Sequence, residues 1–291
     1  MAGVTDATPV QSVMGELRYL APESPVLVTF VTPGNTVQTG VYRPYQVPIH
    51  NGRPIQDQFT IDRNGFAIIE HRSAVRDFTD PGEVERIYAG EIADLVKSGT
   101  GADRVAPLGW VLRESVAPDE LASRRGTAAR PQALLVHDDF SVSAARSTVA
   151  AAYASRFPDG PGYRRALFAS LWRAFSPPPQ DWPLALCDYT SVGPGDGLDC
   201  PMYFVDKVPD DLYAEMPPDT LSTSGVEFHY NPAHRWWYFP GMTREEILFF
   251  KFDDTDHSVA WRTMHSAFHD HTAQATQPRQ SIEFRTVAFF E

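Results

Sequence analysis

Short apolar segments separated by turn residues fill the chain from residue 182 onward, and this pattern limits the fold more than any other feature of the sequence. Strands are expected over 182–192, 202–208, 226–230, 236–239, 247–252 and 282–290. Helical patterns occur earlier in the chain and do not alternate with these strands, which argues against a doubly wound parallel sheet. The residues therefore predict a mainly β protein, a β-sandwich or jelly roll with a helical layer.

The first 175 residues predict a mixture of extended segments and helices. Residues 1–65 look extended and rich in loops. Further along, strands are expected over 26–31, 66–70, 105–113 and 132–140, and helices over 144–157 and 163–175. Another helix is expected to begin after Asp80, with Pro81 at its first position and Glu83 completing a capping box, and to end at 99–101. Residues 114–131 are polar and form a candidate lid.

The 291 residues show no internal repeat, and an all-β unit of this length is commonly one domain. We therefore expect a single domain over 1–291. Within it, residues 1–131 are expected to form an N-terminal extension with a helix and the lid, and residues 132–291 the jelly-roll core. Hydrophobic residues make up 43% of the chain, which excludes a disordered protein.

The net charge is −12, from 37 acidic and 25 basic residues, and it argues against nucleic acid or an anionic membrane as the main partner. There are two cysteines, no basic-then-apolar leader, and no apolar run long enough to cross a bilayer. These features predict a cytoplasmic protein without a membrane partner. A homodimer is expected because most soluble oligomers are symmetric dimers.

His137 and Asp139 are the first candidates for chemistry. They are two residues apart at the end of an apolar segment, so in a strand both side chains leave the same face. Non-heme iron(II) oxygenases bind their metal through two histidines and one carboxylate on one face and leave the opposite face open. The alternative is a histidine at a strand end, hydrogen-bonded beside a solvated loop.

The C-terminal segment offers the remaining parts of such a site. His265 precedes a strand that contains Arg279 and Ser281, which share one strand face and can together bind a carboxylate of 2-oxoglutarate. Arg285 lies on the same face and is a rival anchor. The alternative is that Arg279 pairs with a surface acid, and that Arg285 and Glu283 pair with their neighbours.

Other histidines leave the third metal ligand open at this point. His229 or His234 could take the place of His265, and His269 and His271 form a further pair in a polar loop. The sequence contains no HExxH, GxSxG or GxGxxG motif, which argues against a zincin, an α/β-hydrolase and a dinucleotide-binding enzyme.

Several segments together resemble the CmcJ/NvfI/AsaB-like family of fungal and bacterial oxygenases. The more specific ones are HRWWYFP at 234–240, HSAF at 265–268 and PRQSIEFR at 278–285. Further similar segments are 59–66, 75–78, 88–97, 100–102, 136–139, 184–188 and 248–251. The chain departs from the pattern at 269–271, where histidines occur in place of an expected acid.

The resemblance implies a double-stranded β-helix of the cupin-like kind and an Fe(II)/2-oxoglutarate-dependent dioxygenase that uses O2. It favours His137 and Asp139 as iron ligands. It also favours His265 over His234, because the distal histidine should lie on the strand before the one that carries the arginine. Arg279 and Ser281 would bind 2-oxoglutarate, with Arg285 as the alternative, and aromatic pocket walls are expected from Trp236, Trp237, Tyr238 and Phe250.

The substrate implied by the resemblance is a small hydrophobic secondary metabolite, a terpenoid or meroterpenoid, whose unactivated C–H bond is oxidised. Hydroxylation, desaturation and endoperoxide formation are all consistent with the family. Two rival functions are a non-catalytic jelly-roll partner of a pathway enzyme and a metal-dependent hydrolase. The partner should lack a ligand, and the hydrolase should need neither Arg279 with Ser281 nor oxygen.

Overall fold

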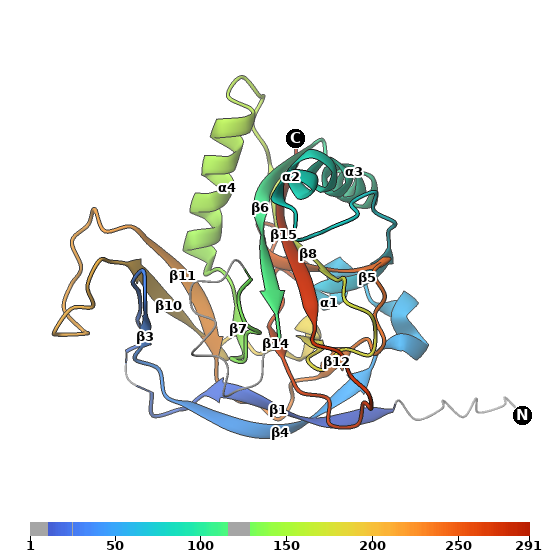
Figure 1. Ribbon diagram of the computed structural model, residues 1–291. Coiled ribbons are helices and arrows are strands. Elements are labelled where there is room, and N and C mark those ends of the chain that lie inside the picture. The colour runs from blue at the N-terminus through green and yellow to red at the C-terminus, as the bar shows by residue number, and fades with distance from the viewer. Residues whose placement is uncertain (1–10, 25, 116–128) are drawn as a thin grey trace, which may run out of the picture.

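Two β-sheets form the framework of the computed structural model, which describes residues 11–24, 26–115 and 129–291 (Figure 1). The larger sheet has the order β1-β4-β12-β9-β14-β7-β11-β10-β2-β3. Its strands are β1 (Ser12–Leu20), β2 (Thr29–Val31), β3 (Thr36–Gln38), β4 (Tyr42–Asn51), β7 (His137–Asp138), β9 (Leu184–Cys187), β10 (Gly197–Phe204), β11 (Ser222–Phe228), β12 (Trp236–Tyr238) and β14 (His265–Ala267).

The smaller sheet has the order β5-β13-β8-β15-β6. Its strands are β5 (Phe66–Glu70), β6 (Arg104–Glu114), β8 (Arg165–Ala174), β13 (Glu246–Asp254) and β15 (Gln280–Phe290). The helical elements are η1 (Arg53–Gln58), α1 (Ile61–Asn64), α2 (Pro81–Glu83), the π-helical η2 (Val84–Tyr88), α3 (Ala89–Thr100), α4 (Val142–Arg156) and η3 (Tyr189–Ser191).

The main core lies between the two sheets, where Trp172 of β8 and Phe250 of β13 pack in one cluster with Leu186 of β9. A second core covers the outer face of the smaller sheet, where Ile92 and Val96 of α3 pack in the same cluster as its apolar side chains. Sheets packed in this way, with a helix on the outer face, confirm the predicted mainly β jelly roll with a helical layer.

The helix expected after Asp80 forms, although its capping differs in part. The Asp80 carboxylate accepts a hydrogen bond from the Gly82 N–H at 2.8 Å, and Pro81 takes the first position. The helical segment ends at Thr100, followed by Gly101 in the left-handed region. The predicted capping box is wrong, because the Glu83 carboxylate accepts from the backbone N–H groups of residues 76 and 77 instead.

The predicted helix over 163–175 is wrong, because this segment is the central strand β8. The helix was expected because Leu167, Leu171 and Phe175 are spaced four residues apart. A spacing of four is even, so it also fits one face of a strand. The other face of β8 contributes Phe168 and Trp172 to the core between the sheets. In a strand that is buried on both faces, the apolar residues form a continuous run, and the alternation of apolar and polar residues is lost.

Segments from both sides of residue 131 enter both sheets. In the larger sheet, β1 and β4 pair over their full lengths, and in the smaller sheet β6 pairs with β15. The expected strand over 132–140 is only the two residues of β7. Residues 116–128, most of the lid candidate, lie outside the described residues. Among the described residues, no helix is long and apolar enough to cross a membrane.

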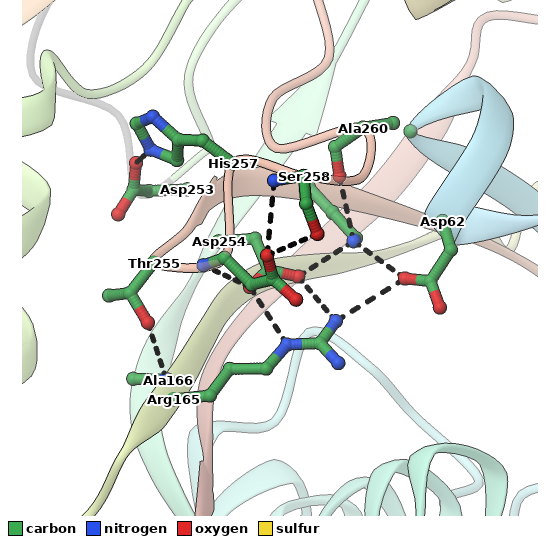
Figure 2. Close-up of polar contacts among 12 residues, drawn as sticks. Asp62, Arg165, Ala166, Asp253, Asp254, Thr255, His257, Ser258 and Ala260 are labelled. Carbon is green, nitrogen blue, oxygen red and sulfur yellow. Dashed lines mark hydrogen bonds and ion pairs between the residues drawn. The ribbon is translucent and has the colours of Figure 1, made fainter.

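A network of charged side chains stabilises the C-terminal end of β13 (Figure 2). The Lys251 ammonium group is fully buried and donates to Asp254 at 2.7 Å, Asp62 at 2.9 Å and the Ala260 carbonyl at 2.8 Å. Arg165 of β8 also donates to Asp254, at 2.7 and 2.9 Å. The network therefore joins β13, β8 and α1 next to the aromatic side chains of β13 that face the core.

Candidate active site

Three predicted metal ligands, His137, Asp139 and His265, lie together between the sheets; we call them the His-Asp-His triad. Strands β7 and β14 are neighbours, and their register places His265 opposite His137. The Asp139 Oδ1 atom lies 3.2 Å from Nε2 of His137 and 3.9 Å from Nε2 of His265. All three ligand atoms lie within 4.8 Å of one another, a separation that one metal ion can bridge.

Backbone carbonyls orient both imidazoles. Nδ1 of His137 lies 2.7 Å from the Leu135 carbonyl oxygen, and Nδ1 of His265 lies 3.0 Å from the Thr263 carbonyl oxygen. An Nδ1–H group that donates to a carbonyl leaves the lone pair on Nε2, which is the common arrangement around metal-binding histidines. The two Nε2 atoms are therefore the ones available for a metal.

The electrostatics of the triad favour a charged carboxylate and a neutral distal histidine. Burial and the neighbouring His137 lower the pKa of His265 to about 3. Burial raises the pKa of Asp139, but the Arg285 guanidinium and His137 outweigh it and hold this pKa well below its usual range. A neutral imidazole and an ionised carboxylate are the forms that bind metals.

A narrow cavity runs from the triad histidines to Arg279. Its lining residues are Arg113, Ala133, His137, Trp172, Leu184, Phe250, His265, Ala267, Arg279 and Glu283. Arg279 is 1% exposed, and its Nη1 atom donates to the Trp182 carbonyl at 2.6 Å. Its Nε has no hydrogen-bond partner, and no carboxylate of the described residues forms a salt bridge with it. Burial and nearby Arg113 lower the pKa of Arg279 to about 9, and Asp181 opposes this shift.

Ser281 and Arg285 share the β15 face of Arg279 but differ in their surroundings. The Ser281 hydroxyl is fully buried and has no hydrogen-bond partner. Arg285 donates to Asp139 Oδ2 at 2.5 Å and to Glu283 Oε1 at 2.8 Å. That Arg285 pairs with a neighbouring residue was the alternative expected from the sequence, while its bond to a triad residue was not expected.

The competing histidines lie outside the triad. His234 contacts Asp196 at 2.9 Å and the Tyr19 hydroxyl at 3.2 Å. His229 contacts the Leu20 carbonyl oxygen at 3.1 Å. His269 and His271 contact each other through their Nδ1 atoms at 2.9 Å. The geometry therefore favours His265 as the third ligand.

Of the aromatic residues expected in the pocket walls, Phe250 lines the cavity and its ring lies 4.8 Å from that of His265. Trp236 is instead buried in a separate core cluster with side chains of β1 and β4, and Trp237 packs on Phe59. The sequence reading missed Trp172 and Arg113 as lining residues. Trp172 was assigned to a helix, and no pattern connects Arg113 with a histidine so distant in the chain.

Comparisons with known proteins agree with this geometry. A family model described as "Oxidoreductase/YMDC permease-like domain" matches residues 17–289. The chain is 30% identical to the hydroxylase/desaturase CTB9 of Cercospora beticola, over 86% of this chain and 78% of that protein. It is 27% identical to the Fe(II)/2-oxoglutarate-dependent dioxygenase nvfI of Aspergillus novofumigatus, over 88% of this chain and 87% of that protein.

The chain belongs to this oxidoreductase family. A solved structure of the iron and alpha-ketoglutarate-dependent endoperoxidase NvfI superposes with a TM-score of 0.77 at 25% identity, covering 96% of this chain and 98% of that one. The similarity to these relatives and to the NvfI structure therefore confirms both the predicted fold and the predicted enzyme class. Its named members are dioxygenases, hydroxylase/desaturases and an endoperoxidase.

Proposed function

We propose that this protein is an Fe(II)/2-oxoglutarate-dependent dioxygenase that oxidises a C–H bond of a small hydrophobic metabolite. The observation that carries the proposal is the convergence of the His-Asp-His triad with a buried, unpaired arginine along one cavity. A metal hydrolase would not need this arginine, and a non-catalytic partner would not need a complete triad.

His137, Asp139 and His265 would hold the iron. The donor set fits, because two imidazoles and one carboxylate on one face are the ligands of non-heme iron(II) oxygenases. Bound iron supplies the activation of O2, coupled to conversion of 2-oxoglutarate into succinate and CO2 and to oxidation of the substrate. The protein contributes the carbonyls of Leu135 and Thr263, which hold each imidazole with Nε2 toward its neighbours.

Arg279 would bind the distal carboxylate of 2-oxoglutarate, with the Ser281 hydroxyl as a second donor. Both are buried and carry unpaired polar atoms, and an unpaired donor in a buried site costs free energy that a bound carboxylate recovers. Trp172 lies under the guanidinium at 5.5 Å and fixes its direction. The apolar walls formed by Trp172, Leu184 and Phe250 exclude water from the reacting centre.

The test is succinate formation from 2-oxoglutarate by the purified protein. We expect succinate only when Fe(II) and O2 are both present, and a fall to background in Asp139→Ala. Asp138→Asn is the matched control, since it changes a neighbouring carboxylate that lies outside the triad, and it should keep the activity. Wild-type protein that forms no succinate would overturn the proposed function.

The substrate is proposed to be a secondary metabolite of the terpenoid or meroterpenoid type. Support comes from the names of the relatives, which include a gibberellin cluster GA4 desaturase of Gibberella fujikuroi at 26% identity. Product analysis by mass spectrometry after incubation with such compounds would distinguish hydroxylation, desaturation and peroxide formation by their mass changes.

A further inference from the structure

Arg285 contacts the one carboxylate of the triad from the opposite sheet. It lies on β15, and its Nη2 atom donates to Asp139 Oδ2 at 2.5 Å. The other oxygen, Oδ1, is the one near the two imidazole Nε2 atoms, at 3.2 and 3.9 Å. The two oxygens of Asp139 therefore have different partners.

We propose that Arg285 is a positioning residue for the metal-binding carboxylate and not an anchor for 2-oxoglutarate. By holding Oδ2, it leaves Oδ1 as the oxygen that faces the metal and keeps Asp139 from turning both oxygens toward it. A carboxylate that binds through one oxygen uses one coordination position, which preserves the open face that this class of site needs. This inference rests on the proposed function, because it assigns Asp139 to a metal.

The surroundings of Arg285 fix its guanidinium in this role. Glu283, on the same strand face, accepts from Arg285 Nε at 2.8 Å. The guanidinium also lies over the rings of Phe140, at 5.2 Å, and Phe252, at 5.6 Å. The side chains of Asp139 and Glu283 are 10% and 4% exposed, so these charge-assisted bonds are shielded from water.

The contrast with Arg279 supports the assignment. Arg285 already binds two carboxylates, and it does not line the cavity that connects the triad histidines with Arg279. Arg279 lines that cavity, and its Nε has no partner. Two arginines on one strand face thus have separate tasks: one holds a metal ligand, and the other is free to bind an incoming carboxylate.

The experiment measures metal affinity and 2-oxoglutarate affinity separately. Co(II) replaces iron because it binds similar ligands and its visible spectrum reports coordination. The affinity for Co(II) is measured first, and the affinity for 2-oxoglutarate is then measured at saturating Co(II). The variants are Arg285→Gln, Arg285→Lys and Arg279→Gln. Arg104→Gln is the matched control, an arginine of the neighbouring strand β6 that pairs with Glu291 and does not line the cavity.

We expect Arg285→Gln to weaken Co(II) binding by about 10- to 100-fold, the usual effect of losing a partner of a metal ligand. Its Co(II) spectrum should change, because Asp139 can then bind through both oxygens. Arg285→Lys should recover part of the affinity, since an ammonium group can still donate to Oδ2. Arg279→Gln should show the reverse pattern, with normal Co(II) affinity and weakened 2-oxoglutarate binding, and Arg104→Gln should keep normal affinity for both Co(II) and 2-oxoglutarate.

Unchanged Co(II) affinity and spectrum in Arg285→Gln would overturn the inference, as would a selective loss of 2-oxoglutarate binding in that variant. If Arg285→Gln does not fold, the Co(II) affinity of Arg285→Lys is compared with that of Arg104→Lys, because only the change at Arg285 should weaken Co(II) binding. Wild-type protein that binds Co(II) but not 2-oxoglutarate would contradict the proposed function. The inference about Arg285 would still be decided by the Co(II) affinities of the Arg285 variants.

Discussion

Lys251 is a fully buried cation between Phe250, which lines the cavity, and Phe252. Its ammonium group has three partners, and two of them are the carboxylates Asp254 and Asp62 (Figure 2). Removing one partner of a buried ion pair leaves the other charge without compensation. The Lys251 side chain is therefore held by its ion pairs and hydrogen bonds and not by hydrophobic contacts.

We therefore expect Lys251→Met to lower the free energy of unfolding by about 3 to 5 kcal/mol. Urea denaturation would measure the change. Lys207→Met is the control, because the Lys207–Asp210 pair is almost fully exposed and exposed pairs contribute little. Equal losses in the two variants would contradict the role given to the buried network.

His137 and Asp139 could be proposed together from the sequence because their relation depends on short-range geometry. His137 and Asp139 are two residues apart, and that spacing alone places them on one face of an extended segment. His265 could be chosen over His234 only with the help of the family resemblance. The contact of Arg285 with Asp139 could not be predicted, because it joins strands of different sheets and depends on how the sheets pack.

At the scale of the elements, Gly65 connects α1 to the segment that orients the triad. It has φ +86°, and a Cβ atom there would lie 2.8 Å from the Arg262 carbonyl oxygen and 2.6 Å from the Thr263 hydroxyl oxygen. The Thr263 hydroxyl donates to the Gly65 carbonyl, and the Thr263 carbonyl oxygen is the partner of His265 Nδ1. A side chain at Gly65 would therefore displace the segment that holds His265.

Gly65→Ala is expected to destabilise the protein by about 1 to 3 kcal/mol through backbone strain and crowding. Gly90→Ala in α3 should instead stabilise it by about 0.5 to 1 kcal/mol, because a Cβ there meets open space and alanine favours a helix. Thermal unfolding of both variants gives the comparison. A stability change of the same sign in both variants would contradict the strain and crowding assigned to Gly65.

The elements differ in how far the sequence alone predicted them. Strand β5 was predicted with its exact bounds and β6 within one residue at each end, because turn residues border both. Strand β8 was mistaken for a helix, since a strand buried on both faces lacks the alternation that reveals a half-exposed one. Strands β1 and β4 were not separated from the surrounding loops, because their pairing with each other and the pairing of β4 with β12 define them.

At the scale of the whole molecule, buried charge makes stability depend on pH. Burial raises the pKa of Asp253 to about 7 from its ordinary value near 3.8, while Arg146 and Arg262 oppose the rise and Asp254 adds to it. His257 lies 3.7 Å away. The folded chain therefore holds this proton more tightly than the unfolded chain does, and its contribution to stability is lost as the pH rises from about 4 to 7.

Asp253→Asn should remove this dependence and stabilise the protein at pH 8 relative to wild type by about 1 to 3 kcal/mol. At pH 4 the two proteins should be similar. Unfolding midpoints across this pH range measure the difference, with Asp256→Asn as the control at an exposed carboxylate nearby. A stability difference that does not vary with pH would show that Asp253 does not titrate in this window.

Two whole-molecule expectations from the sequence stay predictions. The expected homodimer can be measured by light scattering of the purified protein, and the cytoplasmic location by imaging of a tagged copy. The mainly β fold was predictable because many short strands with turn residues between them favour two packed sheets over other classes. The strand order was not, because it depends on pairings between segments far apart in the chain.

The central claim is that the triad and Arg279 together form one site for iron and 2-oxoglutarate. The most direct test is anaerobic titration of the protein with Fe(II) and then 2-oxoglutarate, followed by visible absorption. We expect a weak charge-transfer band that needs both components, is absent in His265→Ala, and requires much more 2-oxoglutarate in Arg279→Gln. A band that persists in His265→Ala, or no band in iron-loaded wild-type protein, would contradict it.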